Sequence, residues 1–343
     1  MVTRNDVARL AGTSPAVVSY VINNGPRPVS ESTRSRVLAA VAELGYRPNA
    51  VARSLRSRRT WTIGVISSDG ASGKSPFFGE FARACEDAAW ECGYSVLLGN
   101  SAEDPRRAEG YVRTFLERQV DGLVLMRVRV GPQEVKEMEA RGIPVVTIDH
   151  EAPAPFSRLA VDDEEGGFLA TAHLVEHGHA RIGFVGGPRT LAPVALRERG
   201  WRRALEAAGR EAGESLVAED ELSLEGGYAA AMRLLGSPRR PTAVFASIDH
   251  QAIGAMRAAA DLGLRVPHDV AVAGFDGARE AAYTVPGLTT IQQPIDAMAR
   301  YATEILIGAV EAGGGEPVER IFPARLVTRG SCGCPEPRTA AAR

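Results

Sequence analysis

A chain of 343 residues is long enough for two or three domains with a large core. It is 45% hydrophobic and 24% charged, as globular domains are, and no apolar run approaches the roughly 18 residues of a membrane-spanning helix, so no transmembrane helix is expected. Polar and charged residues stand where a signal peptide would have its apolar segment, so a cytoplasmic protein is expected.

Charge is distributed unevenly along the chain. Residues 1–60 contain ten Arg, no Lys and three acidic residues, a net charge of +7, whereas the whole chain carries −2 and the remainder therefore −9. A basic head on an acidic body is typical of a nucleic-acid-binding protein. A basic face that is merely solvated is the alternative that charge alone leaves open.

The basic segment begins with two predicted short helices. Apolar residues recur at helical spacing between Asp6 and Asn24, on both sides of a turn formed by Gly12, Thr13 and Ser14. Ser14 followed by Pro15 marks a helix start, because the hydroxyl caps free backbone N–H groups and proline fits the first helical position. The pattern predicts a helix-turn-helix, whose second helix enters the DNA major groove.

A third helix is predicted from about Glu31 to Leu44, with Ser30 as its cap and Gly45 at its end. Asn49 is expected to cap a further short helix over residues 50–57. The expected buried stripe of the third helix consists of Val37, Leu38, Val41 and Leu44.

From Trp61 onward, short apolar runs alternate with helical stretches. Continuous hydrophobicity indicates strands buried on both faces, as in parallel sheets, and the alternation predicts an α/β fold. So many strands fit two doubly wound sheets better than one, with ligands outside the carboxyl ends of the strands. The expected strands are Thr62–Ser67, Tyr94–Gly99, Asp121–Met126, Pro144–Asp149, Arg181–Gly186, Ala243–Ser247 and Asp269–Phe275.

The chain resembles the LacI family of transcriptional regulators from about Thr3 to Cys332. The motifs that carry the resemblance include Asp6-Val7-Ala8, Ala11-Gly12-Thr13-Ser14, Leu44-Gly45-Tyr46-Arg47-Pro48-Asn49, Val185-Gly186-Gly187-Pro188, Arg197-Glu198-Arg199-Gly200-Trp201 and Gly274-Phe275-Asp276. The resemblance implies a small all-α helix-turn-helix head and a hinge helix, followed by an α/β core of two doubly wound parallel-sheet lobes, like a periplasmic sugar-binding protein. It also implies a repressor rather than an enzyme, which binds a pseudo-palindromic operator as a homodimer.

The implied domains are the helix-turn-helix over 1–48, the hinge helix and linker over 49–60, and the effector-binding core over 61–332. A disordered tail is expected over 333–343. Effector binding is expected to move the lobes and to order or melt the hinge helices, with a coupling free energy of about 1–3 kcal/mol. The first lobe would contain residues 61–160 and 292–322, and the second 161–291 and 323–332.

By resemblance, the base-contacting positions of the second helix hold Pro15, Ala16 and Tyr20, and Arg27 adds a contact near the groove edge. Pro15 and Ala16 donate no side-chain hydrogen bond, although Ala16 suits a thymine methyl group. Tyr20 stands where the family commonly has Arg or His, so it is expected to set an unusual operator preference. The other positions of the head and hinge that are expected to contact DNA are Ser14, Ser19, Asn23, Ser30, Thr33 and Asn49.

Leu55 resembles a leucine wedge of the family, which enters the minor groove and unstacks a central base step. Arg56 beside it would meet the negative potential of that narrow groove. An ordinary helix with Leu55 in its apolar stripe is the plainer interpretation.

Three effector-binding positions that the resemblance implies hold Asp149, Arg197 and Asp276. Carboxylates and a guanidinium make directional hydrogen bonds to hydroxyl groups, which favours a carbohydrate or sugar derivative. A nucleobase or another metabolite acting as co-repressor is the alternative. The remaining expected pocket residues are Ser68, Phe77, Phe78 and Ile248, of which the last replaces a common Asn or Ser and so removes one sugar contact.

Two rival interpretations come from other classes of protein. The segment from Ser68 to Ser75 ends in Gly-Lys-Ser like a phosphate-binding loop of an NTPase, but it begins with Ser instead of Gly, and Pro76 follows it. A secreted sugar-binding protein would share the core but would lack the basic head.

Neither a cofactor nor a metal is expected. His173-Leu174-Val175-Glu176-His177 resembles an inverted zinc-peptidase motif, with two His on one helix face, but no further ligand stands out downstream. The cysteines lack the Cys-x2-Cys spacing of common zinc sites, so reduced thiols are expected. The four cysteines are Cys85, Cys92, Cys332 and Cys334.

Overall fold

The structure is a computed structural model, which describes residues 2–22, 25, 27–47, 54, 59–68, 76–148 and 155–335. The chain divides into two compact units, Met1–Thr60 and Trp61–Arg343. None of the helices in the described ranges is long and apolar enough to cross a membrane.

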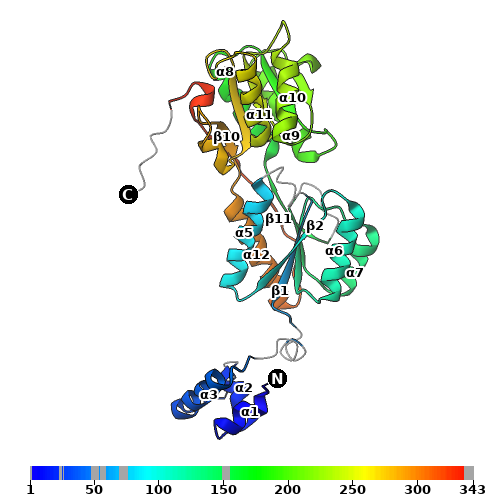
Figure 1. Ribbon diagram of the computed structural model, residues 1–343. Coiled ribbons are helices and arrows are strands. Elements are labelled where there is room, and N and C mark those ends of the chain that lie inside the picture. The colour runs from blue at the N-terminus through cyan, green and yellow to red at the C-terminus, as the bar shows by residue number, and fades with distance from the viewer. Residues whose placement is uncertain are drawn as a thin grey trace. The chain divides into compact units, whose positions relative to one another are not determined.

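The first unit contains three short helices, α1 (Arg4–Leu10), α2 (Pro15–Ile22) and α3 (Glu31–Leu44) (Figure 1). The Oγ of Ser14 accepts a hydrogen bond of 3.3 Å from the backbone of Val17, and Ser30 caps α3 in the same way. Gly45 ends α3 with φ at 60°, where a side chain would be strained. The predicted starts of α2 and α3 and the predicted end of α3 are therefore confirmed, whereas the short helix predicted over residues 50–57 lies outside the described residues except for residue 54.

The core of this unit is built from small and branched side chains. One correction concerns α3: Leu38 is 49% exposed, because it lies about 100° around the helix from the buried Val37. Ala40, three residues after Val37, is buried in its place. The buried residues are Val7, Ala8, Ala11, Val18, Val21, Val37 and Ala40.

The second unit holds two six-stranded sheets with the same winding order. The first sheet runs β2-β1-β3-β4-β5-β11 and is parallel throughout, and the second runs β7-β6-β8-β9-β10-β12 with only its last pair antiparallel. In the first sheet the strands are β1 (Thr62–Ser67), β2 (Ser95–Asn100), β3 (Gly122–Met126), β4 (Val145–Ile148), β5 (Ser157–Val161) and β11 (Glu319–Phe322). In the second they are β6 (Ile182–Gly186), β7 (Val217–Glu219), β8 (Ala243–Ala246), β9 (Ala271–Asp276), β10 (Thr289–Gln292) and β12 (Arg325–Val327). The predicted α/β fold with two doubly wound sheets is confirmed.

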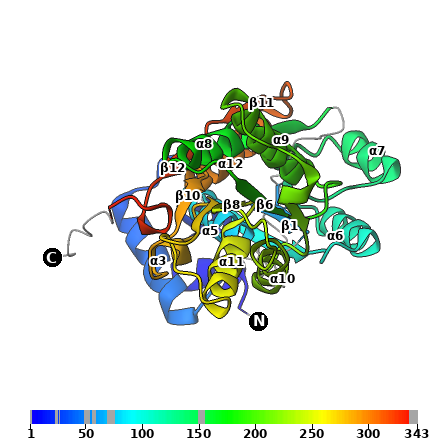
Figure 2. The same ribbon diagram turned by 90° about the horizontal axis from the view of Figure 1, so that it is seen from above.

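Helices cover both faces of each sheet. Figure 1 shows α5 (Pro76–Glu91) and α12 (Ile295–Ala312) on one side of the first sheet, with α6 (Pro105–Glu117) and α7 (Pro132–Ala140) on the other. In the second sheet, α8 (Asp163–Glu176) and α9 (Ala192–Ala207) share one core with the strands. The other face carries α10 (Leu224–Leu235) and α11 (Asp249–Asp261), which lie side by side (Figure 2). We call the first sheet with its helices the N-terminal lobe and the second the C-terminal lobe.

The chain passes between the two lobes three times. It leaves the N-terminal lobe between β5 and α8 at Asp162, returns between β10 and α12 at Gln293 and Pro294, and leaves again between β11 and β12 at Pro323 and Ala324. These passages bring the carboxyl ends of the strands of both sheets to one place. In doubly wound sheets this is the edge where ligands bind.

Candidate functional site

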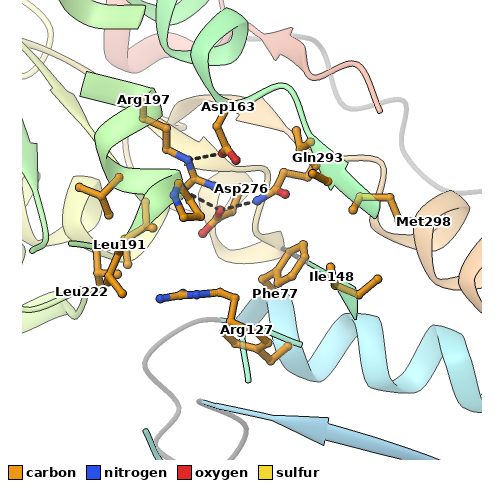
Figure 3. A pocket seen from close by; sticks show the side chains of 16 residues that line it. Phe77, Arg127, Ile148, Asp163, Leu191, Arg197, Leu222, Asp276, Gln293 and Met298 are labelled. Atoms are coloured by element: carbon orange, nitrogen blue, oxygen red, sulfur yellow. Dashed lines mark hydrogen bonds and ion pairs between the residues drawn. The ribbon is translucent and has the colours of Figure 1, made fainter. Parts of the chain in front are cut away.

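A pocket lies between the lobes and is lined by side chains of both. Its polar residues gather around Arg197 in the C-terminal lobe, and Arg127 reaches toward them from the N-terminal lobe (Figure 3). Apolar side chains of both lobes form the rest of the lining, among them Phe77, Phe78, Ile148, Leu191, Leu222, Ile248 and Met298.

Arg197, on the second turn of α9, is held from several directions. Its Nε lies 2.6 Å from Oδ1 of Asp163, and its Nη1 donates to the carbonyl of Ser247 at 2.6 Å. The same Nη1 is 3.5 Å from Oδ1 of Asp276, and the guanidinium carbon stands 3.6 Å from the ring centre of Phe275. These contacts fix the plane of the guanidinium before any ligand arrives, so it is preorganised for directional hydrogen bonds.

Asp276 ends β9 and presents its carboxylate to the pocket. Its φ of 121° is unusual for a residue with a side chain, and such backbone strain clusters at functional sites. Its Oδ1 accepts a hydrogen bond of 2.7 Å from Nε2 of Gln293. Burial raises the pKa of Asp276 to about 6, although the charge of Arg197 opposes the shift. The carboxyl group therefore titrates close to neutral pH.

A second buried carboxyl group supports this wall of the pocket. Asp249, the first residue of α11, accepts hydrogen bonds from the Thr290 hydroxyl at 2.5 Å and from the Ala278 backbone at 2.7 Å. Burial, with the nearby charge of Asp276, raises the pKa of Asp249 well above its ordinary value. The group ties the start of α11 to β10 and to the turn after β9, and so supports the strand end that presents Asp276.

The aromatic side of the pocket comes from the start of α5. Phe77 and Phe78 pack edge to face, with ring centres 5.4 Å apart. Phe78 is 2% exposed and belongs to the core of its lobe, whereas Phe77 is only partly buried and is the ring available to a ligand. Arg127, the residue after β3, stands with its guanidinium carbon 5.7 Å from the Phe78 ring centre.

Five of the seven predicted effector residues line this pocket. They are Phe77, Phe78, Arg197, Ile248 and Asp276. Ser68 lines a neighbouring cavity that also contains Arg127, and Asp149 falls outside the described residues. Three polar lining residues were not predicted, namely Asp163, Arg127 and Gln293.

In the first unit, the predicted base-contacting helix presents Pro15 and Ala16 as exposed residues. Tyr20 is half-buried, because its ring lies against the backbone of Gly25, where an added Cβ would come within 2.5 Å of Cδ1. Of the other predicted DNA contacts, Ser14, Arg27 and Ser30 are exposed, and Ser19 and Thr33 are half-buried. Asn23, Asn49, Leu55 and Arg56 fall outside the described residues.

Comparisons with known proteins identify the class to which this two-lobed fold and its helical head belong. The family model "Bacterial regulatory proteins, lacI family" matches residues 3–49, and a periplasmic binding protein-like domain matches 171–332. The HTH-type transcriptional repressor PurR of Escherichia coli O139:H28 is 38% identical over 335 residues, which cover 96% of this chain and 97% of the relative. The chain belongs to the LacI family of bacterial regulatory proteins.

Solved structures agree with this assignment. The lac repressor dimer bound to operator and the anti-inducer ONPF is similar with a TM-score of 0.85 at 30% identity, covering 96% of this chain and 99% of that one. The complex of the transcriptional regulator CelR with cellobiose gives a TM-score of 0.72 at 31% identity, with 96% and 100% covered. These relatives are transcriptional regulators, and the expected class of function is thereby confirmed.

Proposed function

We propose that this LacI-family protein is a transcriptional repressor that binds a pseudo-palindromic operator as a homodimer and is controlled by a small molecule in the pocket between its lobes. The proposal rests on one observation: a helix-turn-helix unit is joined in one chain to a two-lobed pocket whose central Arg197 is fixed in advance. The solved lac repressor relative is a dimer bound to operator, which supports the proposed assembly. We propose no catalytic activity, because the relatives named above are regulators.

For DNA, we propose that α2 enters the major groove and that Tyr20 makes the distinguishing base contact. Pro15 and Ala16 are exposed at the start of α2 but carry no hydrogen-bonding side-chain group, so base recognition falls on few residues. Leu55 and Arg56, in the expected hinge helix, would then add minor-groove recognition. The domain limits of 1–48, 49–60 and 61–332 belong to the same proposal.

A point substitution and a truncation test the DNA-binding part of the proposal. Leu55→Ala is expected to weaken operator binding in a gel-shift titration while effector binding by the same protein stays unchanged. Removing residues 1–58 is expected to abolish operator binding and to spare effector binding. Unchanged operator affinity of the Leu55 variant would exclude the wedge.

For the effector, we propose a neutral carbohydrate or sugar derivative. Among the lining residues that the structure describes, two guanidinium groups, Arg127 and Arg197, are matched by two carboxyl groups, Asp163 and Asp276, so the described charges balance. A balanced pocket favours a neutral ligand over a phosphorylated one, and fixed donors and acceptors suit hydroxyl groups. The partly buried ring of Phe77 offers an apolar face to a sugar ring. The CelR relative with cellobiose is consistent with this class.

A nucleobase is the second candidate, since the flat ring of Phe77 suits stacking on a planar base. Thermal unfolding of the full chain with neutral sugars, sugar phosphates and free nucleobases separates the two. A ligand at one hundred times its Kd stabilises by about 2.7 kcal/mol, which is easily measured. Stabilisation by neutral sugars alone is expected, stabilisation by nucleobases alone would select the second candidate, and stabilisation by phosphates alone would contradict both.

A further inference from the structure

Four metal-ligating side chains meet on the C-terminal lobe, outside the pocket between the lobes. Two lie at the carboxyl end of α8, His173 within the helix and His177 directly after it, and two lie in and just after η3 (Gly330–Cys332), which follows β12. Figure 1 shows this last turn, in red, beside β10. The four ligand atoms, from His173, His177, Cys332 and Cys334, lie within 4.8 Å of one another.

Three nitrogen–sulfur separations among the four side chains are close to those of a tetrahedral zinc site. Nε2 of His173 lies 3.2 Å from Sγ of Cys332 and 3.6 Å from Sγ of Cys334, and Nε2 of His177 lies 3.4 Å from Sγ of Cys334. With Zn–S near 2.3 Å and Zn–N near 2.0–2.1 Å, tetrahedral geometry places nitrogen and sulfur about 3.5 Å apart. One central zinc ion is therefore compatible with the three nitrogen–sulfur distances.

Local structure brings each pair of ligands together. His173 and His177 are four residues apart, so they lie one turn apart on the same face of α8, with ring centres separated by 4.5 Å. Between the two cysteines, Gly333 has φ at 92°, a conformation that a side chain would strain and that turns the chain back toward α8. The Cys-Gly-Cys sequence is thus suited to direct two sulfur atoms to one point.

The surrounding residues hold the cysteine pair in place. The hydroxyl of Ser331 donates to the carbonyl of Val272 at 2.6 Å and accepts from the backbone of Thr289 at 2.8 Å. The hydroxyl of Thr289 lies 3.0 Å from Sγ of Cys332, as a donor to that sulfur. Such outer hydrogen bonds orient metal ligands and stabilise a thiolate.

We propose that His173, His177, Cys332 and Cys334 bind one structural zinc ion that fastens the end of the chain to α8. On binding, the two thiols release their protons to solvent and the imidazoles coordinate through Nε2, with no change of oxidation state. Two imidazoles and two thiolates complete four-coordinate zinc and leave no position for a water molecule, so the site is closed and structural. This separates it from a zinc peptidase, although the sequence motif of α8 resembles one.

The test uses the full chain, purified with a reductant and without chelators. We expect about one zinc per chain by elemental analysis. When Co²⁺ replaces zinc, we expect the visible absorption of tetrahedral cobalt together with sulfur-to-cobalt charge-transfer bands. Removing the metal with a chelator is expected to lower the Tm, and zinc is expected to restore it.

Matched variants separate the cluster from chance binding. Cys334→Ser and His177→Ala are expected to bring zinc and the cobalt bands to background, whereas Cys92→Ser and His268→Ala, at exposed positions outside the cluster, should keep them. Circular dichroism reports whether each variant folds, and the chelator titration of the wild type needs no variant. Wild-type protein without zinc but with four titratable thiols would overturn the proposal, as would a Cys332–Cys334 disulfide, detected by mass as the loss of two hydrogens.

Discussion

The Arg197 guanidinium meets the Asp163 carboxylate at 2.6 Å, and both side chains are less than a tenth exposed. Asp163 is the first residue of α8, and Arg197 lies on α9, so the ion pair joins the two helices beside the pocket. An ion pair of this kind is costly to break from one side, because the remaining charge stays buried without its partner. The proposed effector pocket therefore also contributes to the packing of α8 against α9 in the C-terminal lobe.

Arg197→Lys is expected to lower effector affinity by at least about tenfold, because Lys cannot reproduce the planar fork that contacts Asp163 and the Ser247 carbonyl together. Titration calorimetry with the ligand found by the thermal screen measures the loss. Arg199→Lys is the control, since Arg199 is 64% exposed on the same helix and pairs with Glu164 at the surface. Equal affinities of the Arg197 variant and the wild type would contradict the assigned role.

Effector binding is expected to weaken below pH 6. The folded-state pKa of Asp276 is about 6, so its carboxylate is increasingly protonated as the pH falls through that value and accepts fewer hydrogen bonds from the ligand. Between pH 7.5 and 5 the association constant should fall by about tenfold. Asp276→Asn should bind more weakly at pH 7.5 and show no step near pH 6, whereas a step that persists in the variant would assign the titration to another group.

The raised pKa of Asp276 affects the stability of the fold in the opposite direction, since a lower pH favours folding through this group. Because burial raises the pKa of Asp276 from 3.8 to about 6, the folded protein binds this proton more tightly than the unfolded chain does. The contribution of Asp276 to the free energy of unfolding is greatest below pH 4 and is lost as the pH rises through 6. Urea unfolding of the wild type and of Asp276→Asn at several pH values, compared as a difference, isolates this contribution from that of other carboxyl groups.

Gly200→Ala is expected to destabilise the protein by about 1–3 kcal/mol and to weaken effector binding. A Cβ at Gly200 would overlap the backbone carbonyl of Glu164, and one at Gly167 would overlap that of Arg197, so α8 and α9 cross closely at these two glycines. Forcing the helices apart moves Arg197 away from Asp163. Gly110→Ala is the control, because that position is exposed on α6 with open space around it, and there alanine should stabilise the helix by up to about 1 kcal/mol.

Gly25→Ala is expected to change operator recognition indirectly, because the added methyl group acts on the Tyr20 ring and not on the DNA. The added Cβ would displace the Tyr20 ring, on which the proposed base recognition depends. Operator titrations should show a loss of discrimination between base pairs at the position that Tyr20 faces, and Tyr20→Phe separates the contribution of the hydroxyl from that of the ring. If Gly25→Ala preserves both affinity and preference, Tyr20 does not contact bases in the orientation proposed.

Strand prediction from the sequence succeeded where the strand is a continuous apolar run; most of these strands are buried, although β2 lies at a sheet edge and its Leu98 is 62% exposed. Each of the seven expected strands is present, since all of them are continuous apolar runs between helices. Two of the strands that were not predicted lack this signal. β11 is almost entirely exposed at a sheet edge, and β10 begins with two buried threonines, Thr289 and Thr290, whose hydroxyls hydrogen-bond to buried partners.

Sites assembled from distant segments were harder to predict than the strands. Arg127 and Gln293 each directly follow a strand, and ligands of doubly wound sheets bind at the carboxyl ends of the strands. That position was the available signal, but the neighbouring residues in the sequence do not mark either one as a pocket residue. The partners His173 and Cys332 are 159 residues apart, and they meet because η3 and α8 both pack against β9 and β10. Resemblance supplied Arg197 and Asp276, and the structure adds Asp163 as the group that holds Arg197.

Gln293 lies in one of the three short passages between the lobes, and its backbone N–H and its side chain both donate to Asp276, at 3.1 and 2.7 Å. Any pivoting of the lobes must be absorbed by the few dihedral angles of these passages, two of which contain proline and are therefore stiff. Gln293 therefore belongs both to a passage between the lobes and to the lining of the pocket. A ligand that alters the Asp276–Gln293 contact would change the conformation of this passage between the lobes directly, with no intervening side chains between the ligand and the passage.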